Sequence, residues 1–184
     1  MLEFNEETHQ YKWDSNPVPS VTQVIRSAAF VDTSFYTEDG RERGTYVHRA
    51  VELWNQGRLD MDTVDDEIFG YLEGWQKYIS DFGMQPVETE KRVYNETYRY
   101  AGTLDYIGIS ESGRRYLIDI KTGGANKTHA MQLAAYRECV DNIDYVRTVY
   151  LSADGKYKAP TVKLTDEWQV FVCALTCFNW KGRK

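Results

Sequence analysis

Two short apolar segments of the sequence each carry an acidic residue, and both lie within residues 102–136 of this 184-residue chain. The first is TLDYI, which contains Asp105, and the second is YLIDIK, which contains Asp119 and Lys121. Both are rich in β-branched and aromatic residues, so we predict two strands, joined as a hairpin by the turn-forming cluster Ser110–Arg114. Side chains alternate along a strand, so Asp119 and Lys121 share a face that Asp105 can reach from the neighbouring strand.

This pattern predicts two carboxylates and one ammonium group at the edge of a small sheet. Unpaired buried charges are unfavourable, so the arrangement needs a compensating partner. Carboxylate oxygens, with water completing the shell, are the ligands that Mg²⁺ prefers, and the pair Asp105 and Asp119 therefore indicates a site for a divalent cation. Lys121 would then lie beside a water molecule or a phosphate oxygen. The alternative is a structural Asp–Lys pair on an exposed strand face.

Three neighbouring features favour the cation site. Gly102 permits close approach of another group to the first strand. The sequence Thr122-Gly123-Gly124 ends the second strand just after the lysine. A helix is then expected over Lys127–Asn142, with Gln132 and Tyr136 one turn apart on one face. The two strands and this helix therefore direct polar groups of several kinds towards one place.

These motifs resemble those of a known family. The succession GxxD, DIKTG and QLAAY is similar to motifs of the PD-(D/E)xK nucleases, and specifically to the RecB-type branch. That branch carries a histidine on an upstream helix, and the segment GTYVHRAVE, with His48, matches this pattern. The overall layout resembles phage-encoded and mitochondrial genome-maintenance exonucleases. The resemblance extends from Pro19 to about Tyr150.

The resemblance implies a restriction-endonuclease-like core and a DNA nuclease that depends on one or two Mg²⁺ or Mn²⁺ ions. It implies an exonuclease that acts on single-stranded DNA or duplex ends. Recombination or replication proteins are the implied partners, and the host cytoplasm of a phage is the implied setting. The implied metal ligands are His48, Glu90 (with Glu88 as the second choice), Asp105, Asp119 and the carbonyl of Ile120. The implied catalytic residues are Asp105, Asp119, Lys121, Gln132 and Tyr136.

Within that mechanism, Lys121 orients a water molecule or stabilises the transition state. Gln132 and Tyr136 contact the phosphate or hold the lysine in place.

Two interpretations of the helix around His48 stay open. His48 and Glu52 are spaced i, i+4, so they form either a surface pair or a pair in which Glu52 orients a histidine that faces the active site. The resemblance favours His48 as a metal ligand or a phosphate contact. Basic residues near these elements either line a path for the nucleic-acid backbone or are ordinary surface residues; they are Arg41, Arg43, Arg49 and Lys127.

The composition sets further bounds. The net charge is −6, which is unusual for a nucleic-acid-binding protein because phosphate contacts favour basic surfaces. The sequence has no long apolar run and no secretory signal, so we expect neither a membrane span nor export. Its three cysteines suggest a reducing cytoplasm and exclude a four-cysteine iron–sulfur cluster. Cys173 and Cys177 are expected as buried thiols on an apolar helix.

The remaining patterns predict the elements that position these residues. We expect an α/β fold in which a small mixed sheet is flanked by helices, with an N-terminal hairpin and a helical lid. The length favours one domain over 1–184, in which 1–84 holds the hairpin and helices and 85–184 the catalytic sheet. No regular period is present over Phe30–Thr37, which we expect to be a loop. The expected strands are Leu2–Trp13 (a hairpin), Gln85–Asn95, Tyr98–Ile109, Tyr145–Ser152 and Lys156–Leu164. The expected helices are Val21–Ala28, Glu42–Asn55, Asp65–Phe82 and one from a Thr165 cap to Trp180.

Two other functions remain as alternatives. A non-catalytic DNA-binding or recombination-accessory module on a nuclease core would bind without hydrolysis, although the intact Asp105, Asp119 and Lys121 argue against it. A metalloenzyme that processes sugars or nucleotides on a similar sheet is the third. The sequence has no glycine-rich phosphate loop, so hydrolysis of nucleoside triphosphates has no support.

Overall fold

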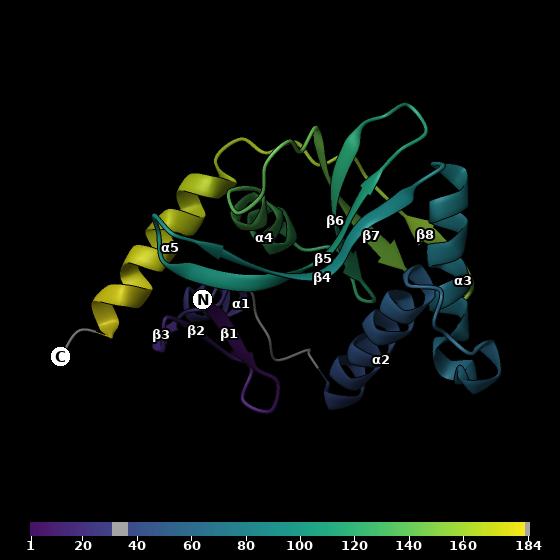
Figure 1. The fold of residues 1–184 in the computed structure, drawn as a ribbon, viewed down its shortest axis with the longest axis horizontal. Helices are drawn as coiled ribbons and strands as arrows, with labels where there is room; N and C mark the ends of the chain where they lie inside the picture. Colours follow the sequence, from purple (N-terminus) through teal and green to yellow (C-terminus); the bar gives the residue numbers. More distant parts are fainter. Residues whose placement is uncertain (31–36, 183–184) are drawn as a thin grey trace.

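The computed structural model of the protein describes residues 1–30 and 37–182 (Figure 1). A five-stranded sheet forms its centre, and the helices cover the two faces of this sheet. The loop that we expected over Phe30–Thr37 lies almost wholly outside the described residues. No helix in the described part of the chain combines the length and the apolar character that crossing a membrane requires.

The central sheet is mixed, as predicted. Its strand order is β4-β5-β6-β7-β8, with β6 and β7 parallel and the other pairs antiparallel. A parallel pair needs a crossover connection, and helix α4 (Lys127–Arg137) provides it. The strands are β4 Gln85–Asn95, β5 Tyr100–Ile109, β6 Arg115–Lys121, β7 Tyr145–Leu151 and β8 Tyr157–Lys158.

Each face of the sheet has its own hydrophobic core. One core contains Leu104 and Leu117 and is closed by three helices, α1 (Val21–Ser27), α4 and α5 (Glu167–Lys181). The other contains Ile118 and Ile120 and is closed by α2 (Glu38–Asn55) and α3 (Asp66–Asp81). A short 3₁₀ turn, η1 (Met61–Thr63), joins the last two helices. The expected helical lid is therefore a packed layer, which buries side chains such as Trp75 completely.

A second sheet of three strands lies at the N-terminus, beneath β4 and β5 in Figure 1. The expected hairpin is confirmed as β1 (Leu2–Asn5) and β2 (Gln10–Trp13). A third strand, β3 (Asn16–Val18), was not expected because it contains Pro17. Proline is tolerated there because β3 is an edge strand. Trp13 stacks on Tyr94 of β4 with ring centroids 4.2 Å apart, which attaches this sheet to the central one.

Several helix boundaries differ from the prediction by one to five residues. Helix α2 begins at Glu38 and not at Glu42, because the Thr37 hydroxyl accepts a hydrogen bond from the Gly40 N–H and caps an earlier turn. Helix α4 ends at Arg137, before Asn142, whose φ of 59° is left-handed and not helical. Helix α5 is preceded by Asp166 at the N-cap position and not by the expected Thr165.

Two strands and two cysteines also differ. The alternation expected along β4 is broken by a register shift between Pro86 and Glu88, which leaves Val87 exposed. Strand β8 has two residues and not the nine expected, and Pro160 follows shortly after it. Cys173 and Cys177, expected to be buried, are exposed because they lie on the outward face of α5, opposite Phe171 and Leu175 of the core.

Candidate active site

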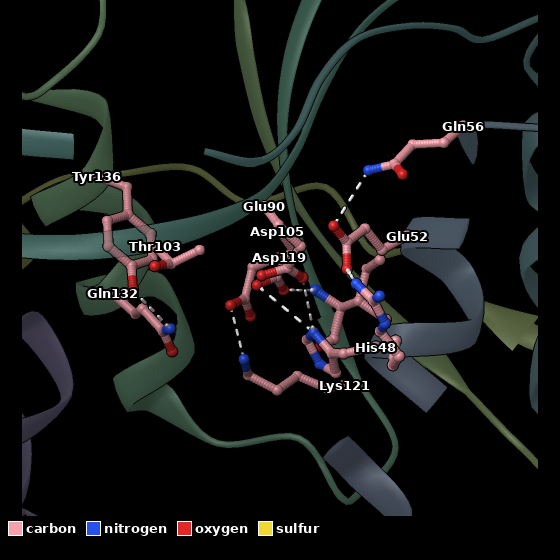
Figure 2. A network of polar contacts seen from close by, with 12 residues as sticks. His48, Glu52, Gln56, Glu90, Thr103, Asp105, Asp119, Lys121, Gln132 and Tyr136 are labelled. Atoms are coloured by element: carbon pink, nitrogen blue, oxygen red, sulfur yellow. Dashed lines mark hydrogen bonds and ion pairs between the residues drawn. The ribbon is translucent and has the colours of Figure 1, made fainter. Parts of the chain in front are cut away.

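The hairpin of β5 and β6 brings together the acidic and basic residues that the sequence singled out. Lys121 donates a hydrogen bond to Asp119 Oδ1 at 2.6 Å, so the two side chains share a face of β6 as expected. Asp105 reaches this place from β5, and its Oδ2 accepts a hydrogen bond from the Ile120 N–H at 2.7 Å. Figure 2 shows the carboxylates of Asp105, Asp119 and Glu90 gathered between Lys121 and His48. Asp105 is therefore aimed at the end of β6.

His48 enters the same cluster from helix α2. Its Nε2 lies 3.1 Å from the carbonyl oxygen of Ile120. Its Nδ1 lies 3.6 Å from Glu90 Oε1 and 3.6 Å from Asp105 Oδ1. Of the two interpretations of this helix, the inward-facing histidine agrees with the structure. Glu52 does not orient the ring, because it pairs with Arg49 at 2.5 Å.

Glu90 has an unusual backbone conformation. Its φ of 46° is left-handed, a region that residues other than Gly, Asn and Asp seldom adopt. Such conformations are unfavourable by about 1–3 kcal/mol and cluster at functional sites. Glu88, the second choice for this role, pairs with Lys91 at 2.7 Å and does not join the cluster. The irregular backbone at Glu90 thus coincides with the delivery of its carboxylate to the site.

Three of the five expected metal ligands form one compact donor group. Ligand atoms of His48, Glu90 and Asp105 all lie within 4.8 Å of one another. Asp119 lies beside this group but is only 1% exposed, and its Oδ2 is buried without a hydrogen-bond partner among the described residues. A buried carboxylate oxygen without a partner is unfavourable, so it is a free ligand position in a set of hard oxygen donors. The residues present therefore fit a divalent cation.

The electrostatics of the cluster are strongly coupled. Burial raises the pKa of Asp105 and of Asp119, while Lys121 and, for Asp105, His48 act in the opposite direction. Burial alone would lower the pKa of His48, but Asp105 and Glu90 together outweigh it and raise that pKa to about 9. Burial likewise opposes the charge on Lys121, yet Asp119 and Asp105 raise its pKa. Two cations, His48 and Lys121, thus offset the charge of the three carboxylates only in part.

Helix α4 contributes Gln132 and Tyr136, which face the cluster from the other side in Figure 2. Gln132 Nε2 lies 3.5 Å from the Tyr136 hydroxyl, as the i, i+4 spacing predicts. The Tyr136 ring lies against Gly102, where a Cβ would come within 2.5 Å of ring carbon Cε1. The packing of Tyr136 therefore requires glycine at position 102. The sequence predicted a close approach at this glycine but did not identify Tyr136 as the group that approaches.

These groups line a cleft of about 900 Å³. Arg41, Arg43 and Arg49 of α2 line it as well, which agrees with the expected path for a nucleic-acid backbone. Arg41 pairs with Glu38, and Arg49 with Glu52. Lys127 was also expected to contact nucleic acid, but it is exposed at the first turn of α4 and is not among the lining residues. Its position follows from the start of α4, where Asn126 caps the helix.

Several cleft residues were not found by sequence reasoning. Tyr11 of β2 bonds to Thr103 through their hydroxyl groups at 2.7 Å, two residues before Asp105. His129 of α4 lies 3.0 Å from the Tyr150 hydroxyl through Nδ1, and burial lowers its pKa to about 4. His9 lines the cleft from the tip of the N-terminal hairpin. Only the position of Thr103 within the GxxD motif, Gly102–Asp105, gave a signal in the sequence.

The fold is shared with a protein of known structure. By sequence alone, no protein family and no characterised protein matches the chain. By structure, the chain is similar to an alkaline exonuclease, LHK-Exo from Laribacter hongkongensis, with a TM-score of 0.52 and 13% identity over 88% of this chain and 86% of that chain. A structure of LHK-Exo in complex with dAMP gives a TM-score of 0.52 and 14% identity over 89% and 87% of the two chains. At such identities the likeness concerns the fold.

Proposed function

We propose that this protein is a divalent-metal-dependent DNA nuclease of the PD-(D/E)xK superfamily, RecB-type branch, contained in one domain over 1–184. The observation that carries the proposal is the convergence of His48, Glu90 and Asp105 with the Asp119–Lys121 pair in one cleft. The likeness in fold to an alkaline exonuclease supports it. The proposed activity is that of an exonuclease on single-stranded or end-containing DNA. The proposed location is the cytoplasm, including the host cytoplasm if the protein is encoded by a phage.

The chain's donors suit Mg²⁺ or Mn²⁺. His48, Glu90, Asp105 and Asp119 would hold one or two ions, together with the Ile120 carbonyl, which now accepts from His48. When bound, such an ion lowers the pKa of a water molecule and neutralises charge on the scissile phosphate. A bound cation would take the place of the His48 proton as the positive partner of Glu90 and Asp105, and that proton would pass to solvent. Most of the ligands that the chain offers are therefore oxygen atoms, and His48 offers the nitrogen ligand.

The other residues orient the reactants. Lys121 is held by Asp119 with its ammonium group at the cleft, where it orients the attacking water and stabilises negative charge that develops on the phosphate. Gln132 and Tyr136 contact the phosphate from α4. Arg41, Arg43 and Arg49 hold the backbone of the strand. Each of these contacts acts through a group that lines the cleft.

The decisive experiment measures cleavage of end-labelled single- and double-stranded DNA with Mg²⁺, Mn²⁺ or a chelator. We expect cleavage only with metal. In Lys121→Ala the rate should fall about a hundredfold to a thousandfold, as for loss of one electrostatic group, while the circular dichroism spectrum is unchanged.

Lys127→Ala is the matched control, because it removes a lysine that lies outside the cleft, and it should cleave normally. Cleavage by Lys121→Ala at the normal rate would reject the role given to this lysine. DNA binding without cleavage under any metal condition would favour the non-catalytic module instead.

A further inference from the structure

A second hollow adjoins the main cleft, between the N-terminal sheet and helix α2. It has a volume of about 630 Å³, and we call it the N-terminal arm. The arm and the main cleft share part of their lining, including Glu90 and Thr103, so they meet beside the carboxylate cluster. The arm then continues away from the cluster. Its own lining includes Phe4, Glu6 and Arg92.

The arm presents flat groups at its surface. The Arg92 guanidinium lies over the Phe4 ring, 4.9 Å from its centroid, and the Arg92 side chain is 47% exposed. The ring of His9, an exposed residue, packs edge-on against Phe4 with centroids 5.8 Å apart. Guanidinium planes and aromatic rings are the surfaces on which bases of single-stranded nucleic acids stack. Phe4 thus supports two groups that are free to stack.

The arm carries two arginines that can contact a phosphate backbone, beside the carboxylates of Glu6, Glu52 and Glu90. Arg92 pairs with Glu6 at 3.0 Å, and Arg49 with Glu52 at 2.5 Å, and the arginine of each pair is about half exposed. Exposed ion pairs contribute little stability, so either arginine can exchange its carboxylate for a phosphate oxygen. Arg41 and Arg43 line the main cleft but not the arm. Arginines therefore lie in both hollows, which share Glu90 and Thr103 in their lining.

We infer that the N-terminal arm binds a single nucleic-acid strand beyond the scissile phosphate, with His9 and Arg92 as the stacking groups. The inference rests on the proposed function, because it places the scissile phosphate at the carboxylate cluster. The volume of the arm is that of an ordinary small-molecule pocket, about 300–1,000 Å³, and the flat groups at its surface favour the unpaired bases of a single strand over a duplex. The site therefore holds nucleotides on both sides of the bond that it cleaves.

Binding measurements in the Lys121→Ala background with Mg²⁺ test the arm without cleavage. The probes are a fluorescein-labelled 12-nucleotide oligo-dT and unlabelled dinucleotide pdTpdT as a competitor. The variants are Arg92→Gln and His9→Asn, because asparagine tolerates the φ of 49° at position 9. The double variant should raise the Kd of the 12-mer about tenfold. The inhibition constant of the dinucleotide should stay within about twofold of that of the parent, because the dinucleotide is too short to reach the arm from the cluster. A duplex closed at both ends should compete poorly.

Lys12→Gln is the matched control, because Lys12 neighbours Tyr11 on β2, is exposed and lines neither hollow. It should bind both probes normally. Three outcomes would each contradict strand binding in the arm. They are unchanged 12-mer binding in the double variant, an equal loss of affinity for both probes, and effective competition by the closed duplex. Cleavage by the unaltered protein is measured in parallel. If the protein cleaves DNA but the double variant binds the 12-mer normally, only the proposed strand-binding role of the arm is rejected. If the double variant loses 12-mer binding selectively but the unaltered protein does not cleave DNA, only the proposed nuclease activity is rejected.

Discussion

At the scale of single residues, the cluster on β5 and β6 is a concentration of charge that the chain's own groups balance only in part. Lys121 satisfies one oxygen of Asp119, and the other is buried without a partner in the described part of the chain. Buried groups of this kind lower stability unless a further partner is present. The proposed cation is such a partner, because it binds the folded chain and not the unfolded one. Metal binding should therefore raise the free energy of unfolding of the protein.

We expect Mn²⁺ to raise the melting temperature of the protein. At a hundred times its Kd, a ligand that binds only the folded state adds about 2.7 kcal/mol, and each 1 kcal/mol shifts Tm by about 2–4 °C in a chain of this size. Asp105→Asn should lose this rise, although its amide oxygen can still accept from the Ile120 N–H. Differential scanning fluorimetry with and without chelator measures the effect.

The control for this measurement is Glu96→Gln, because Glu96 is exposed in the turn between β4 and β5, away from the cluster. It should show the same rise as the unaltered protein. An Asp105→Asn protein that Mn²⁺ stabilises as strongly as the parent would exclude Asp105 from the metal ligands.

At the scale of elements, close contacts of glycine decide how helix α3 rests on the central sheet. A Cβ at Gly70 would lie 1.9 Å from the carbonyl oxygen of Ala153 in the turn between β7 and β8. A Cβ at Gly74 would lie 2.8 Å from the carbonyl oxygen of Lys156. Both obstacles are backbone atoms, which cannot move aside as a side chain can. The helix therefore approaches the turn only because it has no side chain at these positions.

Gly70→Ala should destabilise the fold by about 1–3 kcal/mol or more, because the new methyl group forces α3 away from the turn. The matched change is Gly44→Ala in α2, where the nearest atom, Thr122 Oγ1, would be 3.6 Å from the new Cβ. There the better helix propensity of alanine should stabilise by up to about 1 kcal/mol. Urea denaturation midpoints compare the two variants. Equal midpoints would contradict the proposed close contact of α3.

At the scale of the whole molecule, the net charge of −6 disfavours binding to nucleic acid, whereas the arginines of the cleft favour it. Arg41, Arg43 and Arg49 gather on the part of α2 that borders the carboxylate cluster. Phosphate contacts depend on local cations and are screened beyond about 10 Å at moderate salt, so the distant acidic residues affect them weakly. An acidic protein can therefore carry a local basic path.

Arg43→Gln should weaken DNA binding and reduce the salt dependence of its binding constant. Loss of one phosphate contact lowers the slope of log K against log salt by about 0.7 for a single strand. Arg114→Gln is the control for charge, since Arg114 pairs with Asp144 at the turn between β5 and β6 and lines neither hollow. It should bind as the parent does. Equal slopes for the two variants would leave Arg43 without a phosphate contact.

The sequence by itself determined the parts of the site that are close together along the chain. The alternation of a strand places Asp119 beside Lys121, and a short turn places β5 against β6, whatever the rest of the fold does. The turn of a helix likewise places Gln132 beside Tyr136. These relations need only local backbone geometry, so the hairpin, the crossover helix and the mixed sheet could be predicted.

Tertiary structure alone decided the relations between distant segments. His48 meets the carbonyl of Ile120 across 72 positions of sequence, because α2 packs on one face of the sheet. Packing also buried Asp119, turned Glu90 into the site through a left-handed backbone, and brought His9 to the cleft. The family motifs indicated that His48 and Glu90 belong to the site, but no period or motif gives these contacts, because each contact depends on which surfaces the folded chain brings together.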